Sequence, residues 1–435
     1  MLAYQVRLAV RSLRRNPVLT LLMVGGIGLG IAVAMIFVTL HYVLGGNPIP
    51  SKSDRLHYVQ VDGWDPERPF ESEKPEEPPV QLTHMDMLGL MESDIPTMQS
   101  GMYKGYLTVH PPNNGRPFRE NVRFCFADFF PMFEVPFRYG SGWNGEADQG
   151  PEPVVVLGHA INQRLFGGED SVGRTLRIED RDLRVVGVLE SWRPMPKFYD
   201  VHNGAFDAAE EIYMPFRLGT EMETYSAGNT SGWRPWPDGY EAFLQGEGVW
   251  IQMWVQLDTE EQRQRYRAFL AAYVNEQKKL GRFERPLNNR LRDVMGWLQY
   301  REVVPDPIRA LRILALLFLV ACSVNLIGIL LGKFLARAPE VGVRRALGAS
   351  RRWVFVQHLI ECEIIGVIGG LVGLALSAAG LELVARQFDS QFNFPLDLNM
   401  YLVALGLALA SAMVAGAYPA WRICRIQPSA YLKAQ

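Results

Sequence analysis

The chain has 435 residues, of which 48% are hydrophobic, and its acidic and basic residues nearly balance, leaving a formal net charge of -2. This balance gives no support to a general polyanion-binding role, so nucleic acid is not an expected partner. Apolar residues are concentrated in one block near the N-terminus and three near the C-terminus, and a polar region lies between them.

Residues 1–16 predict a cytoplasmic amphipathic helix that lies along the membrane surface. Its apolar residues share one face, Leu8 is the exception, and the opposite face is basic, with Arg7, Arg11, Arg14 and Arg15. Such a helix lies in the inner leaflet with its arginines near anionic headgroups, so membrane lipids are expected contacts.

Residues 17–45 predict the first transmembrane helix. From Asn16 to Ser51 the chain has no Asp, Glu, Lys or Arg, and its apolar part exceeds the ~20 residues that cross a bilayer. A signal peptide is the competing interpretation, because arginines precede the run. The run is too long for that interpretation, and no cleavage motif of small residues follows it.

The middle region, residues 46–305, predicts a mixed α/β domain outside the cytoplasm. Strands are indicated by β-branched runs, by a hairpin around Glu179–Asp182 and by one half-buried alternating segment, at Pro153–Leu157, Thr175–Ile178, Leu183–Val188 and Ile251–Leu257. Helices are predicted at His159–Phe166 and after Thr259, which forms a capping box with Gln262. Loops are predicted at residues 64–79 and 224–240. Cys125 is the one cysteine of this region, so a disulfide framework is not expected there.

Three further transmembrane helices are predicted in the C-terminal third, at residues 306–333, 354–384 and 399–420. Basic residues crowd the N-terminal segment, the coupling segment 334–353 and the tail 421–435, whereas the loop 385–398 and its flanks are more acidic. The positive-inside rule therefore predicts that both termini are cytoplasmic and that the middle domain is outside.

Small residues recur at four-residue spacing within two of the predicted spans. They are Gly26, Gly30 and Ala34 in the first span, and Gly366 and Gly370, with Gly373 beside them, in the third. Such rows let helix backbones approach closely, so we expect these spans to pack against helices of this chain or of a second copy. Asn325, deep in the second span, predicts an interhelical hydrogen bond, with a substrate contact as the alternative.

The segment between the second and third spans predicts a short coupling helix. Pro339 suits a first helical turn, Glu340 complements the helix dipole, Arg344 and Arg345 suit its end, and Gly348 can terminate it. The helix would present apolar residues to a cytoplasmic partner, with a glycine allowing close backbone approach, at Val341, Val343, Leu347 and Gly342. A plain interfacial loop helix is the alternative.

The sequence contains no G-x-S-x-G, H-E-x-x-H or C-x-x-C pattern, and the stretch nearest to a Walker A loop, residues 328–334, has the wrong spacing. We therefore expect no catalytic, metal or cofactor site, and we expect ATP to be hydrolysed by a separate ATPase chain. Glu361 and Glu363, beside His358, are interpreted as solvated or paired acids, with a proton relay as the alternative.

Residues 337–373, RAPEVGVRRALGASRRWVFVQHLIECEIIGVIGGLVG, resemble the coupling segment and third span of FtsX-like permeases, and residues 418–434, YPAWRICRIQPSAYLKA, resemble their C-terminal signature. The middle region is similar to the MacB-type periplasmic core domain in NPIPSKSDRL (47–56), FADFFPMFEVPF (126–137), VVVLGHAINQRLFGGEDSVGRTLRI (154–178) and LRVVGVLE (183–190).

This resemblance implies a type VII ABC transporter in the bacterial inner membrane. Two permease chains, identical or paralogous, would pair through their first two spans, and two copies of a cytoplasmic ATPase would drive conformational change in the periplasmic domains. The implied function is export or efflux of peptides or drug-like compounds, with a periplasmic adaptor as a further partner. Lipoprotein extraction and FtsX-like signalling to a cell-wall hydrolase are the alternatives, and the large middle domain favours transport or extraction over signalling.

Overall fold

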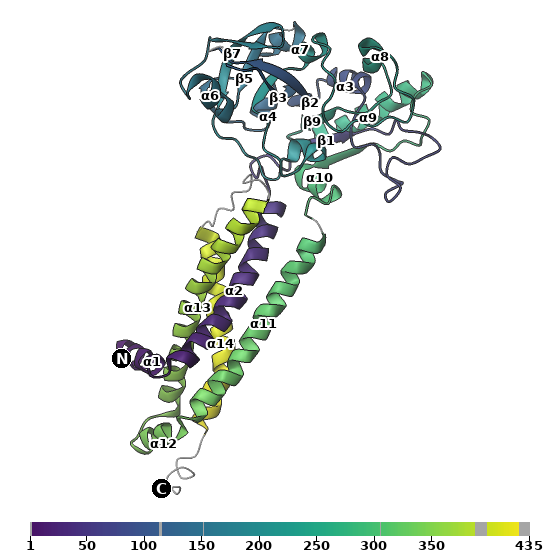
Figure 1. Ribbon diagram of the computed structural model, residues 1–435. Coiled ribbons are helices and arrows are strands. Elements are labelled where there is room, and N and C mark those ends of the chain that lie inside the picture. Colours follow the sequence, from purple (N-terminus) through teal and green to yellow (C-terminus); the bar gives the residue numbers. More distant parts are fainter. Residues whose placement is uncertain (1, 113–114, 151, 305, 388–397, 426–435) are drawn as a thin grey trace. The chain divides into compact units, whose positions relative to one another are not determined.

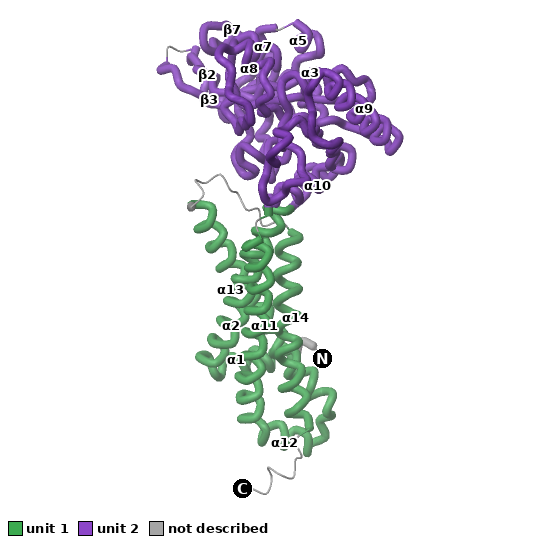
Figure 2. The backbone as a smooth tube through the Cα atoms, turned by 90° about the vertical axis from the view of Figure 1, so that its right-hand side faces the viewer, with its two compact units in different colours: residues 1–45, 304–435 green, residues 46–303 purple. Residues whose placement is uncertain are grey.

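Figure 1 shows the computed structural model of the protein, which describes residues 2–112, 115–150, 152–304, 306–387 and 398–425. The chain forms two compact units, which we call the helical unit, residues 1–45 with 304–435, and the sheet unit, residues 46–303 (Figure 2). Most of the predicted loop 385–398 and of the predicted tail 421–435 lies outside the described residues.

The helical unit contains four helices long and apolar enough to cross a membrane, which are α2 (Pro17–Gly45), α11 (Asp306–Leu335), α13 (Arg351–Gln387) and α14 (Leu398–Cys424). Two shorter helices accompany them, α1 (Leu2–Arg15) before α2 and α12 (Ala338–Ala346) between α11 and α13. The prediction of four spans, with a mixed α/β domain between the first and second, is confirmed.

Helix α2 is central to the packing of the helical unit, because it contacts α11, α13 and α14 (Figure 1). Half of its most apolar window is buried, whereas only 28% of the corresponding window of α11 is buried. The corresponding shares are 39% for α13 and 33% for α14, so in the single chain α11 has the smallest buried share of the four.

The sheet unit is built on one mixed ten-stranded sheet in the order β10-β1-β9-β2-β3-β8-β5-β7-β4, with β6 paired to β2 and β7. Its strands are β1 (Leu56–Gln60), β2 (Met98–His110), β3 (Phe118–Cys125), β4 (Phe137–Gly140), β5 (Val154–Leu157), β6 (Thr175–Ile178), β7 (Arg181–Leu189), β8 (Ile212–Pro215), β9 (Gln252–Gln256) and β10 (Arg290–Asp293). The pairs β3–β8 and β5–β7 are parallel.

Helices cover both faces of this sheet. As a result, neighbouring residues of one strand belong to two different hydrophobic cores. In β9, Val255 belongs to one core and Trp254 to the other. The first core is completed by α3 (His84–Met91), α6 (His159–Phe166), α7 (Phe216–Glu221), α8 (Tyr240–Leu244) and α9 (Glu260–Lys279). The second is completed by α4 (Phe129–Met132), α5 (Gly145–Gln149), the 3-10 helix η1 (Phe198–Asn203) and α10 (Val294–Tyr300).

Local predictions for the sheet unit are confirmed, with two corrections. Thr259 and Gln262 form the predicted capping box of α9, and β6 and β7 form the predicted hairpin. The hairpin turn is tighter than predicted, because β7 already begins at Arg181. The prediction that β9 is half-buried is wrong, since even Gln252 and Gln256 are buried when both faces of the sheet are covered.

The two chain connections between the units begin and end on neighbouring strands. α2 leads into β1, and β10 leads through α10 into α11. β1 and β10 pair antiparallel, with His57 opposite Asp293. The segments that connect to the first two spans are therefore hydrogen-bonded to each other within the sheet unit.

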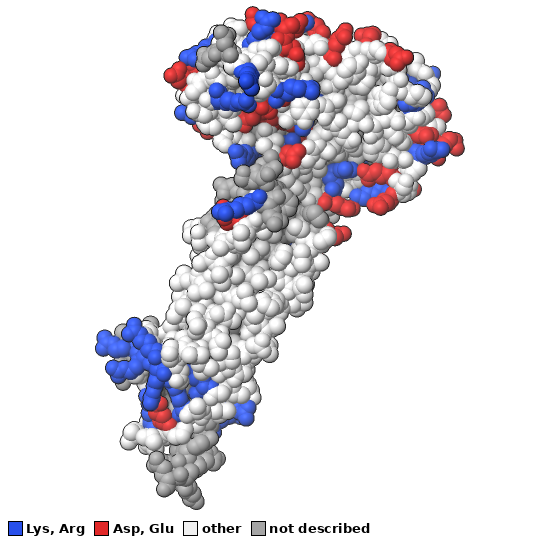
Figure 3. All heavy atoms as spheres, viewed as in Figure 1, with Lys and Arg blue, Asp and Glu red and all other residues white. Residues whose placement is uncertain are grey.

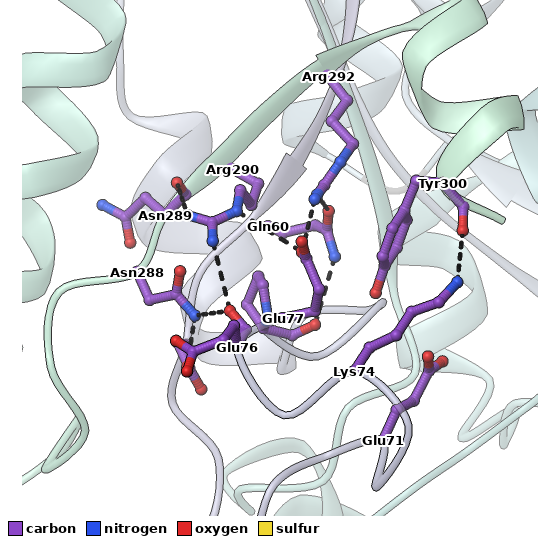
Figure 4. Close-up of polar contacts among 12 residues, drawn as sticks. Gln60, Glu71, Lys74, Glu76, Glu77, Asn288, Asn289, Arg290, Arg292 and Tyr300 are labelled. Atoms are coloured by element: carbon purple, nitrogen blue, oxygen red, sulfur yellow. Dashed lines mark hydrogen bonds and ion pairs between the residues drawn. The ribbon is translucent and has the colours of Figure 1, made fainter.

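The predicted loop at residues 64–79 is fastened to the segment around β10 and α10 (Figure 4). Arg301 forms an ion pair with Glu71 at 2.8 Å, and the ammonium of Lys74 donates to the carbonyl oxygen of Tyr300 at 3.0 Å. Further hydrogen bonds and ion pairs join the two segments through Arg285, Asn288, Arg290 and Arg292. The loop thus reinforces the segment that leads into α11.

Candidate functional site around α12 and the helix ends

Helix α12 forms where the sequence predicts the coupling helix. Pro339 and Glu340 lie in its first turn, and Arg344 and Arg345 lie in its last turn, so its charges stabilise the helix dipole. Gly348 follows with φ of +101°, a conformation that favours glycine. The helix is therefore encoded locally, with a start, a dipole-matched charge pattern and a stop.

The two sides of α12 differ in exposure, which corrects the prediction of a single apolar face. Val341 and Gly342 are buried, and Val341 belongs to the core of the helical unit. Val343 and Leu347 are 47% and 83% exposed. Successive helical residues are rotated by about 100°, so Val341 and Val343 lie roughly 200° apart while Val343 and Leu347 lie on one side. Because Gly342 is buried within the chain, it does not fit the predicted approach of a partner backbone.

Side-chain contacts fix α12 to the neighbouring helices. Arg344 pairs with Glu340 at 2.6 Å, and its other guanidinium nitrogen donates to Gln357 of α13 at 3.4 Å. Arg345 donates to the carbonyl oxygen of Cys424, at the end of α14, at 3.0 Å. A displacement of α12 would therefore be transmitted to α13 and α14.

A buried carboxylate, Glu361 of α13, joins three helix ends beside α12. It pairs with Lys333 of α11 at 2.5 Å and accepts a hydrogen bond from the hydroxyl of Ser12 in α1 at 2.5 Å. Arg337 adds an ion pair to Glu361 at 3.9 Å and also donates to Ser12. Glu361 is thus a paired acid, which agrees with the interpretation of Glu361 as a solvated or paired residue rather than a member of a proton relay.

The partners of Glu361 were not predicted, although the sequence contains a signal for them. Lys333 and Glu361 each lie at the edge of an apolar run, and charges in such surroundings need a partner. The sequence does not say which opposite charge across the helix ends that partner is.

Four of the six predicted small residues, all glycines, pack closely against a neighbouring helix, and a fifth, Ala34, is buried. A Cβ atom on Gly373 would lie 2.8 Å from the carbonyl oxygen of Gly28, and one on Gly370 would lie 2.8 Å from Cβ of Ala408. The same crowding occurs at Gly366 against Ala412 and at Gly30 against Leu319 and Cys322.

Gly26 is exposed in the single chain, and nothing lies within 4 Å of a Cβ atom placed on it, so its packing against a second copy stays a prediction. The packing glycine of this part of α2 is Gly28, two residues further along the helix. Asn325 is also exposed on α11, and no hydrogen bond of its side chain is found among the described residues. The interhelical hydrogen bond predicted for Asn325 therefore stays a prediction for a contact with a second copy.

In the part of the chain that the structure describes, no cluster of three or more His, Cys, Asp or Glu residues could hold a metal ion. The arrangement around α12 can transmit movement, since α12 has an exposed apolar pair on one side and side-chain contacts to α13 and α14 on the other.

Comparison with known families gives two matches that together cover most of the chain. Residues 20–273 match the MacB-like periplasmic core domain, and residues 312–428 match the FtsX-like permease C-terminal region.

Curated relatives are longer proteins. The chain is 24% identical over 306 residues to the pyoverdine export ATP-binding/permease protein PvdT of Pseudomonas syringae pv. tomato, covering 70% of the chain and 41% of that protein. It is 22% identical over 437 residues to the macrolide export ATP-binding/permease protein MacB of Wolinella succinogenes, covering 97% of the chain and 59% of that protein. The chain thus spans about half the length of these relatives.

Among solved structures, the periplasmic region of MacB from Actinobacillus actinomycetemcomitans matches with 13% identity and a TM-score of 0.38, covering 60% of this chain and 97% of that one. The extracellular domain of the noncanonic ABC-type transporter YknZ from Gram-positive bacteria matches with 12% identity and a TM-score of 0.34, covering 55% of this chain and all of that one.

Proposed function

We propose, on the premise that the chain belongs to the MacB/FtsX-type family of ABC transporter permeases, that it couples ATP hydrolysis to export. The family makes it a multi-pass membrane protein with an extracellular domain between its first two spans. The relatives named for pyoverdine and macrolide export support peptides or drug-like compounds as the substrate class.

The observation that carries this proposal is the division of α12 into an attached side and a free side. The attached side holds Val341 in the core and connects through Arg344 and Arg345 to neighbouring helices. The free side exposes Val343 and Leu347. We propose that these two residues dock in an apolar groove of an ABC ATPase, which supplies the ATP-dependent step while the chain itself binds no nucleotide.

The sheet unit would receive the resulting movement through β1 and β10. β1 follows α2 in the chain, and β10 leads through α10 to α11. The two strands are paired to each other. The ion pairs of the 64–79 loop stiffen the segment that leads into α11 (Figure 4). A change in the relation of α2 to α11 would therefore act on one edge of the sheet rather than on separate strands.

The charge distribution supports a bacterial inner-membrane location with both termini in the cytoplasm. On the face seen in Figure 3, Lys and Arg gather over α1 and the neighbouring helix ends, while the middle of the helices is uncharged. The positive-inside rule assigns that basic end to the cytoplasm.

We propose that a second permease chain, identical or paralogous, covers the exposed side of α11 and that each permease of the pair engages one ATPase. Five large apolar residues of α11 are more than half exposed in the single chain, Ile313, Leu314, Leu317, Val320 and Val324. A periplasmic adaptor is a further partner that the family resemblance suggests.

The test is to replace Leu347 and Val343 by Asp, singly, in the full chain expressed with its ABC ATPase. A charge buried without a partner costs several kcal/mol, so we expect ATPase co-purification to fall at least tenfold, which corresponds to about 1.4 kcal/mol or more. Transport-linked resistance should fall with it. Gly342 is unsuitable for this test because it is buried within the chain itself.

Leu280→Asp is the matched control, because Leu280 is 73% exposed in the sheet unit and far from α12 in sequence. This variant should retain the ATPase. Normal ATPase recovery and resistance in both α12 variants would remove α12 from the coupling role. Loss of ATPase binding without any change in resistance would support the signalling alternative over export.

A further inference from the structure

A positively charged cavity lies between α1, α12 and α13, apart from the exposed side of α12. It has a volume of about 140 Å³, and its α1 wall consists of Leu8, Arg11, Ser12 and Arg15. Leu8 is the residue that departs from the amphipathic pattern of α1. Its place in the wall explains the exception, because the cavity combines apolar and cationic groups.

The cavity has more positive than negative charge. Four arginines line it, Arg11, Arg15, Arg337 and Arg344, against the two carboxylates Glu340 and Glu361. Both carboxylates are already paired, Glu340 with Arg344 and Glu361 with Lys333. Among the described residues, no hydrogen bond or ion pair is found for the side chains of Arg11 and Arg15, so these two cations are available to an anion.

An apolar groove continues from the same arginines along α2 and α11. This second cavity, of about 670 Å³, shares Arg15, Arg337 and Glu340 with the first and is further lined by Leu19 and by residues of α11. The α11 wall has no side chains at Gly328 and Gly332, where a Cβ atom would meet nothing within 4 Å. The result is a cationic mouth joined to an apolar channel beside transmembrane helices.

We propose that this composite site binds one anionic phospholipid, with its phosphate between Arg11, Arg15 and Arg337 and one acyl chain against Leu19 and the two α11 glycines. The charge and the shape select this ligand together, because a free phosphate would use only the cationic mouth and a neutral lipid would leave the arginines uncompensated. The bound lipid would bridge α1 to the segment around Arg337 that precedes α12. It would thereby limit the movement of that segment relative to α1.

The test counts lipids bound to the full chain in neutral detergent by native mass spectrometry, with phosphatidylglycerol and phosphatidylcholine as probes. We expect one phosphatidylglycerol per chain at concentrations where phosphatidylcholine is not retained. The double variant Arg11→Gln/Arg15→Gln should weaken phosphatidylglycerol binding roughly thirtyfold, since each arginine near an anionic headgroup contributes about a factor of five.

The matched control is Arg7→Gln/Arg14→Gln, which removes the same charge from the same basic face of α1 at two residues that do not line the cavity. It should change binding by less than about threefold. Equal weakening by both double variants would mean that the arginines act as a diffuse field, and the site would be wrong.

Gly332→Leu tests the acyl channel, because Gly332 lines it and a Cβ atom at this position would meet nothing within 4 Å. We expect it to weaken phosphatidylglycerol binding about tenfold while the melting temperature is unchanged. If Gly332→Leu has no effect and soluble glycerol phosphate competes as well as the lipid, the occupant is a free phosphate and the lipid assignment fails. A pair of chains that retains no phosphatidylglycerol on either copy would also overturn it, whereas a pair that carries one phosphatidylglycerol per chain agrees with it.

Discussion

In the helical unit, neighbouring elements meet backbone to backbone, whereas in the sheet unit they meet ring to ring. Gly373 of α13 faces the carbonyl oxygen of Gly28 in α2 with no side chain between them. In the second core of the sheet unit, the rings of Tyr58 and Trp297 stack with centroids 3.7 Å apart, and Trp254 meets Tyr58 edge to face.

This difference follows from the surroundings of each unit. Lipid gives helices little hydrophobic reason to associate, so close approach and dispersion contacts must hold them together. Water drives large rings inward, so the sheet unit can be stabilised by the apolar area that its aromatic residues bury.

Both units also bury ion pairs, but to different extents. The helical unit has Lys333 and Glu361 at the ends of its helices. The sheet unit has a four-residue cluster inside its second core, made of Arg123, Lys197, Asp200 and Glu210. Burial alone would raise the pKa of Glu210, but the charges of Arg123 and Lys197 together hold that pKa well below its usual range.

The largest effect is expected from Arg123→Met, which would leave Asp200 and Glu210 buried with Lys197 as the remaining cation. Breaking such a cluster from one side costs about 3–5 kcal/mol, so denaturant unfolding of the full chain, followed by tryptophan fluorescence, should show a lower midpoint for the sheet unit. Arg119→Met, an exposed change on the same strand, should cost no more than about 0.5 kcal/mol. Equal costs would show that the cluster does not stabilise this unit.

The next effect is a pH dependence of the sheet unit through His202. Burial, with a smaller contribution from the charge of Arg301, lowers the pKa of His202 to about 4. A histidine in the unfolded chain takes up its proton near pH 6.5, so between pH 6.5 and 4 protonation favours the unfolded state. The contribution of neutral His202 to the free energy of unfolding is fully present above pH 6.5. At pH 4 the free energy of unfolding should be lower by about 3 kcal/mol because of this group.

His202→Gln provides the measurement of that contribution. Denaturant unfolding at pH 7 and pH 4 should show a loss of stability about 3 kcal/mol smaller in the variant than in the parent chain. The same loss in both proteins would assign the acid sensitivity of the sheet unit to other groups.

The sequence predicted those features of both units that depend on near neighbours or on the surrounding solvent. Hydropathy and flanking charge located the four helices because lipid and water act on every residue of a span. The capping box at Thr259 and Gln262 and the hairpin of β6 and β7 were predictable because their partners are close in sequence.

Features that depend on distant partners were not predictable from one sequence. Helix α2 carries two overlapping sets of small residues, and its neighbours, not its own sequence, decide that within the single chain Gly28 packs and Gly26 does not. The limits of α12 were predicted, yet only the core of the helical unit determines that Val341 turns inward. The pairing of Arg123 with residues 77 and 87 positions away likewise depends on the order of strands in the sheet.

The smallest effect is expected from adding one methyl group to a glycine of the helical unit. Two such variants, made one at a time, test whether close backbone approach holds its helices together. In Gly373→Ala the new Cβ would lie 2.8 Å from the carbonyl oxygen of Gly28, and since that atom belongs to the backbone, α2 and α13 must move apart. We expect a loss of about 1–3 kcal/mol in unfolding by a denaturing detergent, followed by far-UV circular dichroism. Gly26→Ala adds the same methyl group where nothing lies within 4 Å, so its stability should be unchanged or slightly higher. Equal stability of the two variants would mean that close backbone approach does not hold α2 to α13. The helical unit would then not differ from the ring-packed sheet unit in the way described above.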